Sequence, residues 1–183
     1  GWCLIPFGGG TNVIEATRCP SKLIEPRPII SVSMKHLNRI LWLNEEDGLA
    51  CVEAGITGRE LVEILEKRGY TMGHEPDSIE FSTLGGWIAT KASGMKRSKY
   101  GNIEDIVVSA RVVSPQGVLW KGSSVEKNVS GRHAEGIDVR SLAFGSEGCL
   151  GIITNAVIRI WPLPEAREYG SVLFPRFEDG LQF

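Results

Sequence analysis

The sequence predicts an α+β fold with largely antiparallel sheets. Three observations lead to this prediction: β-rich runs come in pairs joined by short turns, one segment alone has a clear helical pattern, and strands and helices do not alternate strictly. The length of 183 residues suits one domain, or one domain and part of a second. With 42% hydrophobic and 23% charged residues, the composition is that of a soluble globular protein with a buried core.

Overall charge and cysteine spacing exclude several classes of function. The formal net charge of −2 gives no reason to expect nucleic acid or an anionic membrane surface as a partner. No apolar run is long enough to span a bilayer. The four cysteines are scattered without metal-binding or redox spacing, as expected for small buried residues in a reducing compartment. We therefore predict no metal site.

The first third of the chain is predicted to form strands. Pro6 ends the first strand, and the turn 44–48 joins the last two strands as a hairpin. The predicted strands are Trp2–Ile5, Ile29–Val32, Arg39–Leu43 and Leu49–Ala54.

A helix is predicted after the last of these strands. Thr57 and Glu60 have the spacing of a capping box, and Leu61 and Leu65 share one face. Gly69 is the predicted end of this helix.

The stretch His74–Gly101 combines hydroxyl-bearing residues and glycines with large apolar residues. This mixture is typical of a backbone that lies against a large ligand with an apolar end and a polar end. Gly85 and Gly86, which lack a Cβ, would let the main chain approach it closely. Thr83 is the predicted N-cap of a short helix that continues to Ala92 and stops at Gly94, with free N–H groups aimed at the ligand. An ordinary glycine-rich loop followed by a short helix is the alternative.

Strands again dominate the second half of the predicted structure. Residues 106–113 and 118–120 form a hairpin around Pro115–Gly117, and residues 121–138 form an exposed loop. A short helix at 139–144, a strand at 152–161 and a short strand at 171–174 follow. The chain begins with the apolar run at Trp2 and stops just after a helix begins near Phe177. We therefore expect a piece of a longer protein, whose targeting signals lie elsewhere.

Three glycine-dense turns occur in a fixed order: PFGGGTN at 6–12, the Ser/Thr/Gly stretch at 77–93, and GSEGCLGII at 145–153. The first can form an anion-binding nest, although it matches neither of the two best-known nucleotide loops. Over essentially the whole chain, this arrangement resembles the PCMH-type FAD-binding domain of the vanillyl-alcohol oxidase superfamily. The runs VEAGITGRELVEILEKRGY and GHEPDSIEFSTLGGWIATKASGMKRSKYGNIEDIVV resemble the alkyldihydroxyacetonephosphate synthase (alkylglycerone-phosphate synthase) branch in particular.

The resemblance implies two subdomains with FAD between them. It assigns residues 1–165 to the FAD-binding domain, without its first strand and helix, and residues 166–183 to the start of a C-terminal substrate or cap domain. Because a strand and a helix precede this point in the family, we expect an exposed, aggregation-prone sheet edge beside Trp2–Ile5.

The resemblance also implies which residues contact the cofactor, position by position. The pyrophosphate loop would be Pro6, Phe7, Gly8, Gly9, Gly10, Thr11 and Asn12. The flavin and ribityl chain would lie along Asp77, Ser78, Ile79, Glu80, Phe81, Ser82 and Thr83. Further contacts would come from Thr90, Lys91, Ala92 and Ser93. The cofactor would be closed over by Glu147, Gly148, Cys149, Leu150, Gly151, Ile152 and Ile153.

Two positions depart from the family pattern. Cys149 stands where threonine is common, which raises a covalent flavin link as one hypothesis and a simple small-residue replacement as the other. Asn12 stands where serine is common in this branch. No histidine lies beside the pyrophosphate loop, so the expected cofactor is noncovalent FAD.

The implied activity is an ether-lipid synthesis. An alkyl transferase of this branch exchanges the acyl group of acyl-dihydroxyacetone phosphate for a fatty alcohol, giving alkyl-dihydroxyacetone phosphate, and uses FAD without net redox change. The family's acid–base residues belong to a C-terminal domain, so no catalytic residue is assigned here. His36, His74 and His133 are scattered. The basic group around Lys96 is interpreted as a solvated loop rather than a phosphate site.

The resemblance implies a peroxisomal location and leaves open a homodimer and peripheral membrane association through parts outside this chain. Two other functional hypotheses remain. An FAD-dependent 2-hydroxyacid dehydrogenase acting on D-lactate or glycolate shares the general frame, but usually lacks Trp87 and the ASGMK run that begins at Ala92. Alternatively, the isolated chain is inactive and only maintains the fold.

Overall fold

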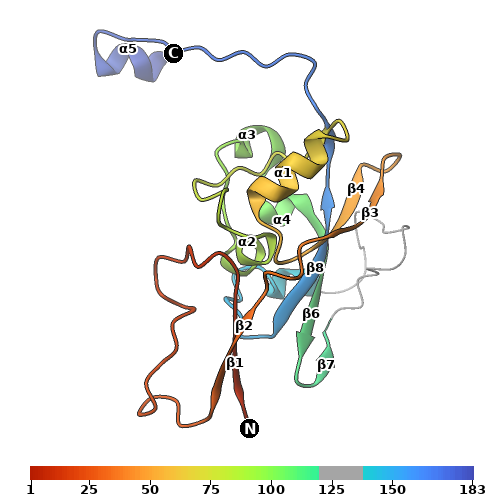
Figure 1. Cartoon of the computed structure of the whole chain (residues 1–183). Coiled ribbons are helices and arrows are strands. Elements are labelled where there is room, and N and C mark those ends of the chain that lie inside the picture. Colours follow the sequence, from red (N-terminus) through yellow and green to blue (C-terminus); the bar gives the residue numbers. More distant parts are fainter. Residues whose placement is uncertain (120–137) are drawn as a thin grey trace.

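A five-stranded antiparallel sheet is the central element of the computed structural model, which describes residues 1–119 and 138–183. Its strand order is β3-β4-β8-β6-β7 (Figure 1). The strands are β3 (Ile40–Asn44), β4 (Leu49–Glu53), β6 (Val107–Ser114), β7 (Gly117–Val118) and β8 (Ile152–Arg159). Both predicted hairpins are present, and the α+β prediction with largely antiparallel sheets is confirmed.

Two further sheets have two strands each. β1 (Cys3–Phe7) pairs with β2 (Ile29–Ser33) in parallel, and β5 (Tyr70–Thr71) pairs with β9 (Trp161–Pro162) in antiparallel fashion. Pro6 lies inside β1, opposite Val32, so the prediction that it ends the strand was wrong. A two-stranded sheet consists of edge strands alone, where a missing N–H is tolerated.

Helices pack against one face of the central sheet (Figure 1). The described helices are α1 (Gly58–Glu66), α2 (Leu84–Thr90), α3 (Arg97–Tyr100), α4 (Ile103–Ile106), the 3₁₀ turn η1 (Val139–Leu142) and α5 (Phe177–Gln182). Among these, no helix has the length and apolar character needed to cross a membrane.

The capping box of α1 forms as the sequence predicts. The Thr57 side chain accepts from the Glu60 backbone N–H, and the Glu60 carboxylate accepts from the Thr57 N–H at 3.0 Å. Leu61 and Leu65 are completely buried. Local signals therefore fix both the start and the buried face of this helix.

The end of α2 differs from the prediction. The helix begins after Thr83, as expected, but it ends at Lys91, whose φ of 52° is left-handed. The Ala92 N–H then bonds to the Trp87 carbonyl at 2.9 Å, closing the helix end. Gly94 lies beyond this end and is buried against His74, so it is a packing residue and not the stop.

Both faces of the middle strands are buried. Toward the helices, Val52 and Ile158 join a core that includes Leu84 and Ile88 of α2. On the opposite face, Leu49, Cys51, Val108 and Val157 form a second cluster with Trp42. The sheet thus supports α2, and α2 forms one wall of the site described below.

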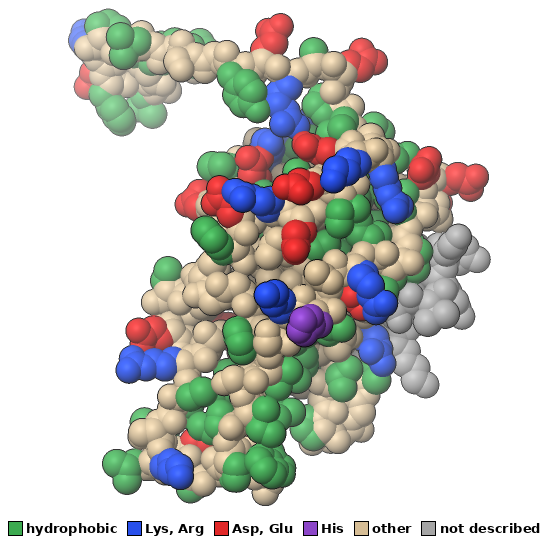
Figure 2. All heavy atoms as spheres, viewed as in Figure 1, with side chains coloured by type: hydrophobic (Ala, Val, Ile, Leu, Met, Phe, Trp, Pro, Cys, Tyr) green, Lys and Arg blue, Asp and Glu red, His purple; other side chains and the backbone are tan. Residues whose placement is uncertain are grey.

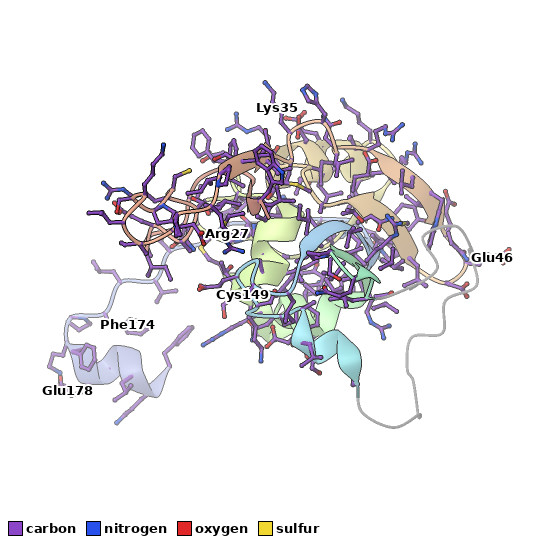
Figure 3. The ribbon with its side chains drawn as sticks, turned by 90° about the horizontal axis from the view of Figure 1, so that it is seen from below. Arg27, Lys35, Glu46, Cys149, Phe174 and Glu178 are labelled. Atoms are coloured by element: carbon purple, nitrogen blue, oxygen red, sulfur yellow. The ribbon has the colours of Figure 1, made fainter. Side chains whose placement is uncertain are left out.

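The C-terminal segment extends away from the body of the protein (Figure 1). Figure 3 shows Phe174 and Glu178 on this extension. Residues 171–174 have no strand, so that prediction was wrong, whereas the helix expected near Phe177 is present as α5. The loop predicted for 121–138 lies outside the described residues, except for Asp138. The proposed domain boundary at residue 165 stays a prediction.

Candidate functional site

A cavity of about 390 Å³ lies where the three glycine-dense turns meet. Its volume falls within the range of roughly 300–1,000 Å³ that is usual for small-molecule sites. Predicted cofactor-binding residues from all four segments line it: Pro6, Phe7, Gly8, Gly9, Gly10, Thr11, Asn12, Ser78, Ser82, Thr83, Thr90, Ala92, Glu147, Gly148, Gly151 and Ile153. The fold therefore brings together segments that are far apart in the sequence.

The glycine loop after β1 is packed against the turn before α2. A Cβ on Gly9 would overlap the Phe81 carbonyl, with the carbonyl carbon only 2.5 Å away. A Cβ on Gly8 would meet the Thr83 side chain, including its Cγ2 at 2.9 Å. These two glycines are thus required by contact between two protein segments. Gly10 differs, because its φ is +68° and a Cβ added there would have no atom within 4 Å.

The same loop lines the cavity and carries hydrogen-bond donors that no described protein acceptor uses. Within the described residues, the backbone N–H groups of Gly8, Gly9, Gly10 and Thr11 donate to no protein acceptor. Consecutive N–H groups on one loop form a concave site for anions such as phosphate. These residues therefore fit the pyrophosphate of the predicted FAD.

The first N–H groups of α2 are already used inside the protein. Leu84 donates to the Ile56 carbonyl at 3.1 Å and Gly85 to the Ala54 carbonyl at 2.7 Å. Gly86 donates to the Thr83 hydroxyl oxygen at 3.4 Å. The expectation of free N–H groups at this helix start was therefore wrong, and the anion site rests on the glycine loop. Gly85 also packs against Ala54, where a Cβ would lie 2.9 Å from the alanine Cβ.

Two hydroxyl groups of the cavity wall are engaged as donors. Ser82 donates to the Ser78 carbonyl at 2.8 Å and accepts the Trp87 indole N–H at 2.7 Å. Thr90 donates to the Gly86 carbonyl at 2.9 Å. Both hydroxyls could thus meet a ligand as acceptors, and Trp87 is held in one orientation within the wall.

The loop before β8 is attached to the C-terminal end of α2. Gly145 donates to the Ile88 carbonyl at 3.1 Å, and Glu147 donates to the Ala89 carbonyl at 3.0 Å. Glu147 has a φ of +47°, which is uncommon for a residue other than glycine. These bonds place the Glu147–Gly148 backbone on the cavity wall.

Other predicted cofactor residues do not line the cavity. They are Asp77, Ile79, Glu80, Phe81, Lys91, Ser93, Cys149, Leu150 and Ile152. Some are engaged elsewhere: Glu80 lies 3.3 Å from Arg59, and Lys91 lies 3.7 Å from Glu104. Cys149 is an exposed free cysteine in the loop before β8 (Figure 3).

Several lining residues were missing from the sequence prediction: Val13, Ile14, Ala16, Thr17, Met34, Ala54, Pro76, Gly85, Gly86, Trp87 and Ala89. Gly85, Gly86 and Trp87 could have been predicted as lining residues, since they belong to the stretch His74–Gly101, whose composition is typical of a backbone that lies against a ligand. Met34 and Ala54 reach the cavity through tertiary packing, which no local pattern records.

His74 lies behind Trp87 and not in the cavity. The two rings meet edge to face at 4.9 Å, and His74 is 2% exposed. Neither ring nitrogen has a partner among the described residues. Burial lowers the pKa of His74 to about 4, so the ring is neutral near pH 7. This fits a packing histidine.

The basic residues near residue 96 are largely engaged with their own surroundings. Lys96 pairs with Glu75, and Lys99 lies over the Tyr100 ring. Lys96 and Lys99 therefore have protein partners, and neither residue lines the cavity. The described residues contain no group of side chains that could hold a metal ion.

Comparison with known proteins identifies close relatives. The alkyldihydroxyacetonephosphate synthase of Caenorhabditis elegans is 47% identical over 98% of this chain. A solved structure of an alkyldihydroxyacetonephosphate synthase superposes with a TM-score of 0.80 at 42% identity, covering 90% of this chain and 28% of that one. The glycolate oxidase subunit GlcD of Bacillus subtilis is 31% identical over 98% of this chain and 36% of its own length.

These relatives are much longer than the chain, which spans 29% of the Caenorhabditis elegans synthase. A family profile described as "FAD binding domain" matches residues 1–123, which is more than half of the sequence. The match covers the glycine loop, the turn before α2 and α2 itself. The chain therefore belongs to the FAD-binding domain family.

Proposed function

We propose that this chain is the FAD-binding portion of an ether-lipid synthase. The full enzyme would exchange the acyl group of acyl-dihydroxyacetone phosphate for a fatty alcohol, giving alkyl-dihydroxyacetone phosphate. The observation that carries the proposal is the 47% identity to an alkyldihydroxyacetonephosphate synthase, against 31% for a glycolate oxidase subunit over the same share of the chain.

FAD is the cofactor of this domain family, and in this enzyme class it supplies a flavin ring that serves the exchange without net redox change. In the proposed site, the N–H groups of Gly8–Thr11 would hold the pyrophosphate. The wall fixed by Ser82 and Trp87 would orient the cofactor, and Met34 and Ala54 would add apolar surface to the site. The acid–base groups of the reaction are proposed to lie outside this chain, which leaves it no catalytic residue of its own.

We further propose that the flavin is bound without a covalent link. Cys149, the residue that raised the opposite hypothesis, is exposed and does not line the cavity. A peroxisomal location, a homodimer and membrane association of the full protein remain proposals that rest on the family resemblance alone.

The cofactor assignment is tested by visible absorption of the purified full-length protein before and after acid precipitation. Flavin released into the supernatant is expected. Flavin retained in the pellet would contradict the noncovalent proposal and return attention to Cys149. A protein that takes up no flavin, even with added FAD, would contradict the functional proposal itself.

The reaction class is tested on the same full-length protein with two assays. Labelled fatty alcohol should be incorporated when acyl-dihydroxyacetone phosphate is present. Electron-acceptor dye should not be reduced by D-lactate or glycolate. Dye reduction without alkyl transfer would instead identify a 2-hydroxyacid dehydrogenase, the alternative that shares the domain family.

A further inference from the structure

The chain continues along the cavity beyond the glycine loop, in a turn that the sequence analysis did not assign to the site. Val13, Ile14, Ala16 and Thr17 of this turn line the cavity next to Gly8–Thr11. Val13 is 93% exposed and Ile14 is 65% exposed. Two large apolar side chains are therefore held in solvent at the cavity rim, although exposure is unfavourable for them.

The side chain of Asn12 holds this turn. Its Oδ1 accepts the backbone N–H groups of Ile14 and Ala16, each at 3.1 Å. Glu15 adopts a left-handed φ of 56°, and its carboxylate accepts from Arg18 at 2.7 Å. Because Oδ1 already accepts two N–H groups, Asn12 acts on the shape of the turn more than on a ligand.

We propose that the Val13–Thr17 turn is a ring-binding wall of the FAD site and that Asn12 is its positioning residue. This proposal rests on FAD being the ligand. FAD carries two phosphates in its middle and a flat heteroaromatic ring at each end. Since the phosphate-binding N–H groups lie directly before the turn, an apolar wall there is placed to cover one of those rings. Ring binding would also remove the Val13 and Ile14 side chains from water.

The wall is tested by FAD titration of the full chain, followed by quenching of flavin fluorescence. The double variant Val13→Ser with Ile14→Ser should raise the Kd about tenfold or more. The reason is that burying one methylene group against a ligand increases affinity roughly fourfold, and the variant removes several such groups. The matched control is Leu23→Ser. Leu23 is 97% exposed, lies in the same segment and does not line the cavity, so the Kd of this variant should be unchanged.

Two failures are distinguishable. A wild-type chain that binds FAD no more tightly than the double variant would overturn the wall alone. A wild-type chain that binds no FAD would overturn the proposed function and, with it, the wall. Repeating the titration with ADP tells which ring is covered: loss of ADP affinity in the double variant indicates adenine, and unchanged ADP affinity with weakened FAD indicates the flavin ring.

The positioning role of Asn12 is tested separately. Asn12→Ala removes the acceptor and should weaken FAD binding, change the visible circular dichroism of bound flavin, and speed tryptic cleavage after Arg18 in the free chain. Asn12→Ser keeps a short acceptor oxygen and should restore most of each property. Wild-type affinity together with wild-type cleavage in Asn12→Ala would show that the side chain does not hold the turn.

Discussion

Individual glycines of the site serve different purposes, and Gly9 shows why contact between segments matters. Its missing Cβ lets the loop lie against the Phe81 carbonyl. The space that a side chain at this position would need is already occupied by that carbonyl group. The glycine loop is thereby held against the turn before α2, and its residues line the cavity. A side chain at Gly9 would act by separating two walls of the site, before any ligand arrives.

Gly9→Ala is therefore expected to abolish flavin binding, as is the larger Gly9→Val. Flavin occupancy is measured from the ratio of visible to ultraviolet absorbance of the purified protein after FAD addition. Gly69→Asn is the control, because Gly69 has a φ of +81°, a conformation that asparagine tolerates, and a Cβ added there would have no neighbour within 4 Å. Full occupancy in Gly9→Ala would show that the loop does not need this contact.

A buried histidine makes stability sensitive to acid. His74 titrates near pKa 6.5 when unfolded and near 4 when folded, so the unfolded state binds more protons between these values. The shift corresponds to roughly 3 kcal/mol of unfolding free energy lost as pH falls from 6.5 to 4.

His74→Phe should keep the ring contact with Trp87 and remove this titration. Because neither nitrogen of His74 has a partner among the described residues, no hydrogen bond is lost. Urea unfolding at pH 7 and pH 4.5 should give a smaller difference for the variant than for the wild type. Equal differences in the two proteins would mean that His74 is not responsible.

Among the helices, α1 depends on the cap at its N-terminal end. The Thr57 hydroxyl accepts from Glu60 N–H, and Thr57 also forms a bridge with Thr83, the cap of α2. Thr57→Ala should lower the free energy of unfolding by about 1 kcal/mol, whereas Thr57→Ser should lower it by much less. Chemical denaturation measures both. A serine variant as unstable as alanine would point to the methyl group rather than to the cap.

Elements whose signals are local could be predicted from the sequence. Thr57 and Glu60 lie three residues apart, so the start of α1 could be predicted from their capping-box spacing. The end of α2 could not be predicted, because it lies at Lys91 in a left-handed conformation that lysine rarely adopts. Gly94 misled the prediction, since it is a glycine because it packs closely against His74 and Glu75. Pro6 remained in a strand because its sheet has only two strands.

The candidate site, like the secondary structure, could be predicted only where its signals are local in the sequence. The glycine loop and the Ser82–Thr83 turn carry compositional signals, and both line the cavity. The sequence could not show that the first N–H groups of α2 are already bonded, since their acceptors, the carbonyls of Ala54 and Ile56, come from a distant segment. The Val13–Thr17 turn had one readable signal, an asparagine followed by a turn, but its position on the cavity depends on tertiary structure.

Viewed as a whole, the protein exposes a group of apolar side chains on the small β1–β2 sheet. Hydrophobic atoms gather at the lower end of the space-filling view, where this sheet lies (Figure 2). Leu4 and Ile30 are register partners, 49% and 43% exposed, and Trp2 is exposed as well. A two-stranded ladder with an apolar exposed face and unpaired edges is a template for association.

The isolated chain is therefore expected to self-associate through this sheet. Sedimentation equilibrium should show an average mass that rises with protein concentration, and Leu4→Lys should reduce that rise because a charge on an edge strand opposes pairing. Leu173→Lys is the matched control: its side chain is equally apolar and even more exposed, but it lies on the C-terminal extension. If both variants reduced association equally, added charge alone would be the cause. A wild-type chain that stays monomeric at all concentrations and melts cooperatively would show that the exposed sheet is stable without a partner.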